Sequence, residues 1–510
     1  MRNVVQRLTK KKHKKNNRPA TPPLHSKPGL RGITGRGGGS MPYIETADEF
    51  IGSTVQACGL YPFTSGVGAP NIGVPLGKHQ ITRASVCADP ISWFERASLI
   101  SNPSAVILSK PGLGKSTVAD IWAVGLRAYG VLPWFFGDVK GEHVDINEAL
   151  GGDRIQFGRA NAINILDSRA ERTAAHRLPA DAREHVRAEG HNRRQSMVEA
   201  LLTIRRQQPM WHREQSVLDI ALALLEERGE RDGRVPTLID LRNLLSEAPD
   251  ELRHAAIDRG SEQRYREITE DMEAALAGIV SGRTFGGTFS GESNVQIDPD
   301  KPVCFDVSSV KPGETELMAA CLVATWSTGF GSLNITHALA DAGLEEDRRY
   351  FLILDEVWRA LRVGHGMVDH YDSLTRLNRT WGTGQVMNVH SFKDFESLPT
   401  QHDRDKAQGF MDRAGMLVLG GISQGEVETL QRVVDLNPRE REALTSWATP
   451  PSWNVRRNRH DAPPGRGKFL IKSGDSPGIP IDVEAAEPLL RLHDTNQRWQ
   501  NRLDDPVMES

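Results

Sequence analysis

Residues 105–120, AVILSKPGLGKSTVAD, are the stretch that decides the fold. A short apolar run leads into a loop rich in Pro and Gly, and a helical pattern begins directly after it. A strand, a glycine-rich loop and a helix in this order form a P-loop, whose backbone N–H groups and helix N-terminus hold phosphate oxygens. We therefore predict a nucleotide site formed by Pro111, Gly112, Leu113, Gly114, Lys115, Ser116 and Thr117.

Two side chains of this loop have separate expected roles. Lys115 is expected to reach the β- and γ-phosphates, and the Ser116 hydroxyl to hold Mg²⁺. One position departs from the pattern G-x-x-x-x-G-K-[ST], because Ser109 stands where the first glycine belongs. Glycine reaches positive φ angles without strain, so we expect Ser109 to change the shape of the loop at a modest cost. For the loop taken alone, an ordinary glycine-rich turn is the alternative.

A second nucleotide-site motif lies in residues 348–361, RRYFLILDEVWRAL. Its continuous apolar run is typical of a buried parallel strand, and the run ends in Asp355-Glu356. This is the Walker B arrangement, in which Asp355 is expected to hold Mg²⁺ and Glu356 to polarise the attacking water. The alternative is a buried strand followed by an acidic helix N-terminus. Together with the loop, the acid pair favours Mg²⁺-dependent ATP hydrolysis, with ATP and Mg²⁺ as cofactors.

The order of patterns along the chain predicts an α/β fold with a mostly parallel sheet. Strand patterns surround the two motifs, whereas the middle of the chain is dense in Arg, Glu, Ala and Leu with helical periodicity. We expect a disordered basic tail (1–40), a short β-rich lead-in (41–104), a core in two parts (105–168 and 291–490) separated by an all-helical insertion (169–290), and a C-terminal helix and tail (491–510). Late in the core, residues 467–472 and 479–483 suggest a hairpin or two edge strands.

Composition and charge exclude several classes of protein. The chain is 38% hydrophobic and 25% charged, as soluble globular proteins are, and no apolar run reaches membrane-spanning length. Four cysteines without paired spacing predict a reducing cytoplasm, with neither disulfides nor a zinc site. Residues 1–40 hold 11 of the 63 Lys and Arg and no acid, so the rest of the chain has a net charge of −14. This tail is expected either to bind nucleic acid such as DNA, or anionic lipid, or to be solvated without a specific partner.

Further candidates follow predicted strands. Lys140 and Glu142 lie at the strand edge where parallel sheets bind ligands, and a charged turn is the alternative. His390 ends another strand, where it is expected to sense the γ-phosphate or orient water, unless it is a structural histidine. Arg376 and Arg379 are candidates to stabilise transition-state charge in a neighbouring subunit, against the alternative of surface arginines.

Several of these motifs together resemble a known family, the motor ATPases of type IV secretion and conjugative DNA transfer (the fourth VirB protein type, TraC-like, within the HerA/FtsK superfamily). The resemblance covers roughly residues 55–500. It rests on PGLGKST, on DVKGE at 138–142, on NAINILD at 161–167, which has Ile165 where the family has Pro, and on LDEVW at 354–358, which is close to the family's L-D-E-A-W. Residues 379–382, RTWG, look like the family's R-K-x-G, and His390-Ser391 stands where the family usually has T-Q-S, so that His390 replaces its Gln sensor.

The resemblance implies a RecA-like P-loop motor domain with an all-helical insertion, without most of the large domain that often precedes it in this family. It also implies a homo-hexamer at the cytoplasmic face of a membrane, docked on the inner-membrane subunits of a secretion channel. There, ATP hydrolysis would power translocation of DNA or protein, or channel assembly. The alternatives are a DNA-pumping ATPase of the HerA or FtsK type, a conjugative coupling protein, and a catalytically weak scaffold.

Overall fold

The computed structural model describes residues 71–158, 161–285, 287–293, 296–362, 368, 382–398, 400–454, 459–460 and 462–492. The chain divides into two compact units, Met1–Thr64 and Ser65–Ser510, and all described residues belong to the second. The basic tail, Arg376 and Arg379 lie outside the described residues, as does the start of the β-rich lead-in.

The described strands build one large sheet whose central part is parallel. The sheet has the order β2-β1-β13-β12-β9-β3-β8-β7-β4-β6-β5. Its parallel strands are β3 (Ser104–Leu108), β4 (Leu132–Asp138), β5 (Asp153–Gln156), β6 (Val303–Asp306), β7 (Tyr350–Leu354), β8 (Gly384–Val389) and β9 (Met416–Leu419). Strands β3, β4 and β7 are buried along their whole length, which explains their continuous apolar sequences. The expected α/β fold with a mostly parallel sheet is confirmed.

Antiparallel strands extend one side of this sheet. They are β1 (Pro75–His79), β2 (Ser85–Cys87), β12 (Lys468–Lys472) and β13 (Ile479–Val483). The expected hairpin forms between β12 and β13, but neither is an edge strand: β12 also pairs with β9 and β13 also pairs with β1. A separate two-stranded ribbon joins β10 (Trp453–Asn454) and β11 (Arg459–His460).

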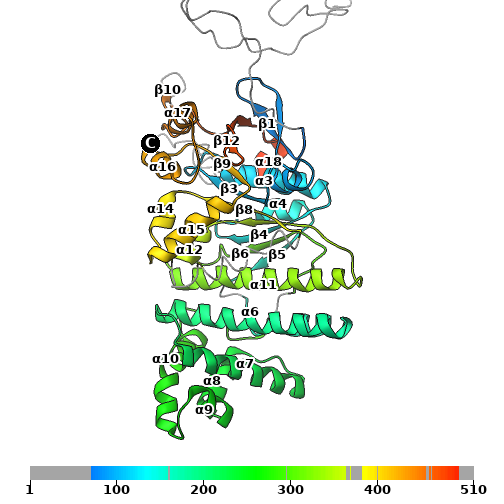
Figure 1. Cartoon of the computed structure of the whole chain (residues 1–510), viewed down its shortest axis with the longest axis vertical. Helices are drawn as coiled ribbons and strands as arrows, with labels where there is room; N and C mark the ends of the chain where they lie inside the picture. The colour runs from blue at the N-terminus through cyan, green and yellow to red at the C-terminus, as the bar shows by residue number, and fades with distance from the viewer. Residues whose placement is uncertain are drawn as a thin grey trace, which may run out of the picture. The chain divides into compact units, whose positions relative to one another are not determined.

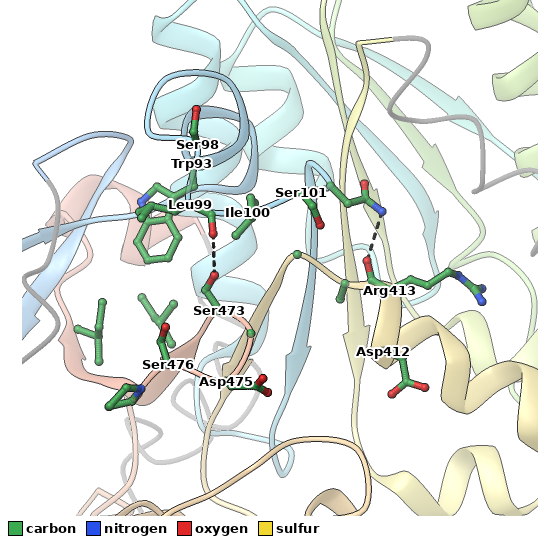
Figure 2. Close-up of a pocket in the computed structure, with 17 residues that line it drawn as sticks. Trp93, Ser98, Leu99, Ile100, Ser101, Asp412, Arg413, Ser473, Asp475 and Ser476 are labelled. Carbon is green, nitrogen blue, oxygen red and sulfur yellow. Dashed lines mark hydrogen bonds between the residues drawn. The ribbon is translucent and has the colours of Figure 1, made fainter.

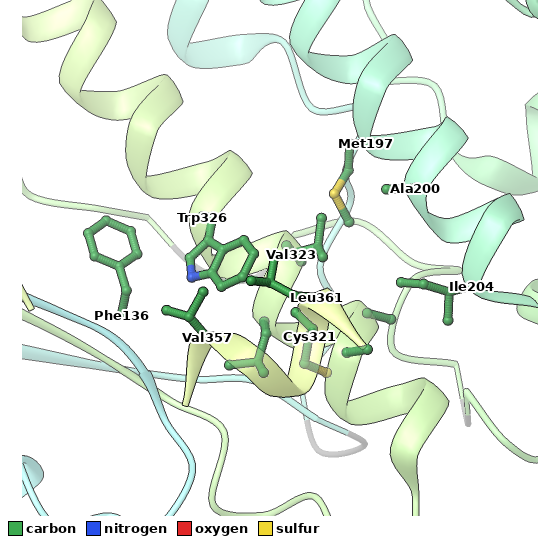
Figure 3. Packing of buried hydrophobic residues seen from close by; sticks show 14 of the residues in the cluster. Phe136, Met197, Ala200, Ile204, Cys321, Val323, Trp326, Val357 and Leu361 are labelled. Atoms are coloured by element: carbon green, nitrogen blue, oxygen red, sulfur yellow. The ribbon is translucent and has the colours of Figure 1, made fainter. Parts of the chain in front are cut away.

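Helices cover the sheet and connect its strands. Outside the stretch between β5 and β6, the described helices are α2 (Pro90–Glu95), α3 (Lys115–Ala128), α4 (Val144–Ala149), α11 (Thr315–Asp341), α12 (Val357–Leu361), α14 (Phe392–Glu396), α15 (Gln401–Arg413), α16 (Gln424–Leu430), α17 (Pro438–Trp447) and α18 (Glu487–Leu492). The long helix α11 lies against β4 and is buried over most of its length. Figure 3 shows its Trp326 among apolar side chains that include Phe136 of β4 and Val357 of α12.

A run of helices separates β5 from β6 in the sequence. It comprises α5 (Arg169–Arg177), α6 (Ala180–Arg206), α7 (His212–Asp232), α8 (Leu238–Glu247), α9 (Asp250–Ala256) and α10 (Glu262–Ser281). Helix α6 runs alongside α11, and α7 to α10 pack on the side of α6 that faces away from the sheet (Figure 1). Arg193 of α6 donates to the Ser327 carbonyl of α11 over 3.3 Å and pairs with Glu171 of α5, so the contact between core and helical segment includes charged groups.

Candidate nucleotide site

The parallel strands bring the motif residues to one edge of the sheet. The loop that carries Lys115 follows β3, Asp355 and Glu356 follow β7, and His390 follows β8. Strand β8 pairs in parallel with both β3 and β7, so it places His390 between the two motifs. The carboxyl ends of parallel strands are where α/β folds bind ligands.

The loop between β3 and α3 has the backbone that a phosphate cradle requires. Gly112 and Gly114 have φ angles of 78° and 105°, in the region that favours glycine. Neighbouring segments brace the loop, because the Lys110 N–H donates to the Gly421 carbonyl and the Leu113 carbonyl accepts from the Gly467 N–H. Helix α3 begins at Lys115, so its N-terminus faces the loop.

Ser109 corrects one expectation about this loop. It is fully buried, and its φ angle is not among the positive ones, so the backbone cost expected for a non-glycine residue does not arise. The side chain fits because Gly420, after β9, faces it. A Cβ atom on Gly420 would lie 2.5 Å from Ser109 Oγ. The glycine that the motif lacks at position 109 is matched by a glycine on the neighbouring strand end.

Lys115 points into the loop. Its Nζ donates to the carbonyl oxygens of Ser109 and Lys110 at 2.7 and 3.3 Å. Burial lowers the pKa of Lys115 to about 8, from an ordinary value of 10.5, although the carboxylate of Asp355 acts in the opposite direction. A buried ammonium at a glycine-rich loop suits the binding of phosphate, which would supply the missing negative charge.

The turn after β4 connects the loop to the acid pair. Ser116 Oγ donates to Glu142 at 3.1 Å, and Lys140 Nζ lies 3.8 Å from Glu142 and 3.3 Å from Glu356. The buried Asp138 fixes this turn by accepting the N–H groups of Glu142 and His143. Lys140 and Glu142 thus lie between the phosphate loop and the acid pair, in the charged turn that joins β4 to α4. Their position after a parallel strand was the signal in the sequence.

Asp355 and Glu356 are both buried, and their environments differ. Burial raises the pKa of Asp355. Burial acts in the same direction on Glu356, but the hydrogen bond and charge of His390, together with Lys140 and Arg359, hold the pKa of Glu356 well below its usual range. His390 Nε2 lies 3.2 Å from Glu356 Oε1, and Arg359 Nε donates to Oε2 at 3.1 Å. Arg359 was not predicted from the sequence as a residue of the site.

A buried histidine–aspartate pair lies beside this site and was not predicted from the sequence. His143 Nδ1 and Asp120 Oδ1 are 2.7 Å apart, and the imidazole stacks on the Phe135 ring. Burial opposes a charge on His143, but the Asp120 carboxylate outweighs it and raises the pKa of His143 to about 10. The charge of His143 also acts on Asp355, where it opposes the rise in pKa that burial causes.

The residues present fit a magnesium ion. Mg²⁺ prefers oxygen ligands and usually takes only one or two from the protein. The Ser116 hydroxyl and the Asp355 carboxylate supply such oxygens, and a cation would offset the burial of Asp355. Within the described ranges, no cluster of three or more His, Cys, Asp and Glu side chains forms a metal site, so a transition-metal centre has no candidate there.

A separate cavity of about 880 Å³ lies at the opposite edge of the sheet (Figure 2). Ser101 and Asn102 line it just before β3, and Ala414 and Gly415 just before β9, so it is at the amino ends of the parallel strands. It contains none of the motif residues.

No family model matches this chain, and no curated protein matches it. Among solved structures, it is similar to VirB4 of Thermoanaerobacter pseudethanolicus, with a TM-score of 0.59 and 19% identity over 84% of this chain and 100% of that one. The fold is shared with VirB4. The expected RecA-like P-loop fold is thereby confirmed, and so is the VirB4-type resemblance at the level of the fold.

Two other similarities are weaker. The conjugative coupling protein TrwB matches with a TM-score of 0.47 and 12% identity over 82% of this chain and 91% of that one. It has also been solved in complex with ADP and Mg²⁺. The cytoplasmic domain of the type VII secretion ATPase EccC of Thermomonospora curvata matches with a TM-score of 0.31 and 12% identity, covering 85% of this chain and 32% of that one.

Proposed function

We propose that this chain is a Mg²⁺-dependent ATPase that powers a type IV secretion or conjugation system. The proposed ATP hydrolysis is supported by a continuous set of contacts that joins the phosphate loop to the acid pair. Ser116 bonds to Glu142, Glu142 lies near Lys140, and Lys140 pairs with Glu356. Two motifs more than 200 residues apart in the sequence therefore form a single site.

Each side chain has a role that its position supports. Lys115 and the loop N–H groups bind and orient the phosphates, and Ser116 with Asp355 holds Mg²⁺, which neutralises phosphate charge when bound. Glu356 orients the attacking water, and His390 keeps Glu356 in place. Arg379 is proposed to act on the phosphates of a neighbouring subunit, as the motif resemblance implies.

The motor role rests on the shared fold with VirB4 together with the LDEVW and DVKGE motifs. We propose a homo-hexamer at the cytoplasmic face of the membrane, bound to inner-membrane subunits of a channel, with residues 1–40 contacting DNA. In the described part of the chain, no helix is both long and apolar enough to cross a membrane. The expected hexamer would appear as a nucleotide-dependent increase in mass by light scattering, and a protein that stays monomeric with ATP would contradict it.

The hydrolysis site is tested by Lys115→Ala. We expect phosphate release and binding of Mg·ATP both to be lost, because the substitution removes the ammonium that holds the phosphates. Lys78→Ala is the matched control, since Lys78 also pairs with a glutamate but lies on β1, outside the site. If Lys115→Ala binds and hydrolyses ATP as the control does, the proposed site is wrong.

A further inference from the structure

Both oxygens of the Glu356 carboxylate contact cationic or hydrogen-bonding side chains, and Oε1 contacts two of them. Lys140 Nζ and His390 Nε2 lie 3.3 and 3.2 Å from Oε1, while Arg359 Nε lies 3.1 Å from Oε2. A group that orients or deprotonates water needs an oxygen within hydrogen-bond reach of that water. Three cationic or hydrogen-bonding partners also stabilise the charged carboxylate and make it a weak base. Oε1 already has two partners, so it becomes available to water only when one of them leaves.

Of the three partners of Glu356, Lys140 loses the fewest other contacts when it moves away. His390 and Arg359 are largely buried, and the Arg359 guanidinium also stacks 4.9 Å from the Trp358 ring. The Lys140 side chain is 43% exposed and flexible, and it already has a second carboxylate, Glu142, within ion-pair range at 3.8 Å.

The second carboxylate is held in place before Lys140 moves. Asp138, which is 1% exposed, accepts the Glu142 N–H at 3.0 Å and the His143 N–H at 2.8 Å, so the backbone beside Glu142 is fixed. The Glu142 side chain bonds in turn to Ser116 at the start of α3. Glu142 is therefore on the side of the phosphate loop, and Glu356 is on the side of β7.

We propose that Lys140 alternates between Glu356, where it keeps the carboxylate occupied, and Glu142, where it leaves Glu356 free to act on water. Phosphate held by Lys115 adds negative charge on the Glu142 side and draws the ammonium that way. Lys140 and Glu142 are thus positioning residues that couple occupancy of the loop to release of Glu356. This inference rests on the proposed ATP hydrolysis.

The kinetic test is a double-variant cycle on the full chain, with kcat and KM measured separately. Lys140→Met should raise kcat about twofold to fivefold, the range that a half-exposed ion pair can contribute. KM should rise by no more than about the same factor, because the phosphate loses its attraction to the ammonium. Glu142→Gln, which keeps an oxygen for Ser116 to donate to, should lower kcat by a similar factor. The double variant should have the kcat of Lys140→Met alone. Glu142 acts by holding Lys140 away from Glu356, so its loss has no effect once Lys140 is absent. Lys78→Met is the matched control, because the Lys78 side chain is 41% exposed and also pairs with a glutamate.

Other kinetic outcomes contradict the proposal. A KM raised by about 100-fold or more in Lys140→Met would mean that Lys140 binds the nucleotide directly. A double variant as slow as Glu142→Gln would mean that Glu142 acts through Ser116 and not through Lys140.

A structure of the full chain with Mg²⁺ and a non-hydrolysable ATP analogue separates this proposal from the proposed function. We expect Lys140 Nζ to bond to Glu142 and to leave Glu356 Oε1. If Lys140 stays on Glu356, the alternation is wrong even where the wild type hydrolyses ATP. If the wild type hydrolyses no ATP, the proposed function fails, and the position of Lys140 in this complex still decides whether it moves.

Discussion

Ser109 and Gly420 occupy one small volume beside the phosphate loop. The Gly420 N–H donates to the Leu108 carbonyl, which fixes the strand end close to Ser109. A Cβ atom on Gly420 would lie 2.5 Å from Oγ and 2.7 Å from Cβ of Ser109. The two positions are therefore coupled, and a side chain can be accommodated at only one of them.

This coupling predicts a rescue. Gly420→Ala should destabilise the protein by about 1–3 kcal/mol, as overpacking of a dense core does. Adding Ser109→Gly removes the two clashing atoms and should recover much of that loss. Thermal unfolding of both single variants and the double variant measures the effect. Simple additivity of the two single effects would show that the pair is not coupled.

The His143–Asp120 pair predicts a pH-dependent contribution to stability. The pKa of His143 rises from 6.5 to about 10 on folding, mainly because Asp120 outweighs the effect of burial. The stabilisation is therefore fully present below pH 6.5 and is lost as pH rises towards 10. Asp120→Asn should cost about 3–5 kcal/mol near neutral pH, because it removes the carboxylate that stabilises protonated His143 in the folded state.

Denaturant unfolding at pH 6, 8 and 9.5 checks this prediction. The difference between wild type and Asp120→Asn should shrink steadily over this range. A difference that stays constant with pH would show that the pair is held by packing alone.

The lowered pKa of Lys115 predicts that nucleotide binding weakens at high pH. Its pKa of about 8 means that the free protein loses the ammonium above that pH, whereas bound phosphate requires it. Affinity for Mg·ADP should therefore fall as pH rises from 8 to 9.5, by up to about tenfold per unit. Calorimetric titration at several pH values measures this, and an affinity that is flat to pH 9.5 would contradict the buried, weakened ammonium.

At the scale of elements, α11 packs against the sheet through a glycine. A Cβ atom on Gly329 would lie 2.2 Å from Cε1 of Phe136 on β4. Gly329→Ala should destabilise by about 1–3 kcal/mol, although alanine is the better helix former. Gly425 of α16 is the control, because a Cβ there meets nothing within 4 Å, and Gly425→Ala should stabilise by about 0.5–1 kcal/mol. Chemical denaturation measures the free energy of unfolding of both variants. A change in the same direction for both would contradict the close packing of Gly329 on Phe136.

The strands and their ends were the most predictable elements. The apolar runs before Lys115 and Asp355 indicate buried parallel strands, and the residues before His390 have a strand pattern. The carboxyl ends of parallel strands lie at one edge of the sheet. The sequence therefore predicts which residues share the site. It does not predict that Lys140 pairs with Glu356, or that Arg359 does, because these contacts depend on side-chain rotamers and on the order of β4, β7 and β8 in the sheet.

The pairing between segments that are distant along the chain could not be predicted from the sequence. Strand β1 pairs with β13 about 400 residues later, so the lead-in and the end of the core share one sheet. Local periodicity carries no information about such partners. The buried His143–Asp120 pair was not predicted for the same reason, because a histidine and an aspartate 23 residues apart have no characteristic spacing.

The proposed site is built from two motifs and hydrolyses ATP. Glu356→Gln tests it most directly, because the substitution removes the group proposed to orient water and leaves the phosphate loop intact. Phosphate release and Mg·ATP binding should be measured on the same preparation. We predict that binding is retained while turnover falls by about 100-fold or more. If Glu356→Gln turns over ATP at the wild-type rate, Glu356 does not orient the attacking water and the proposed site is wrong.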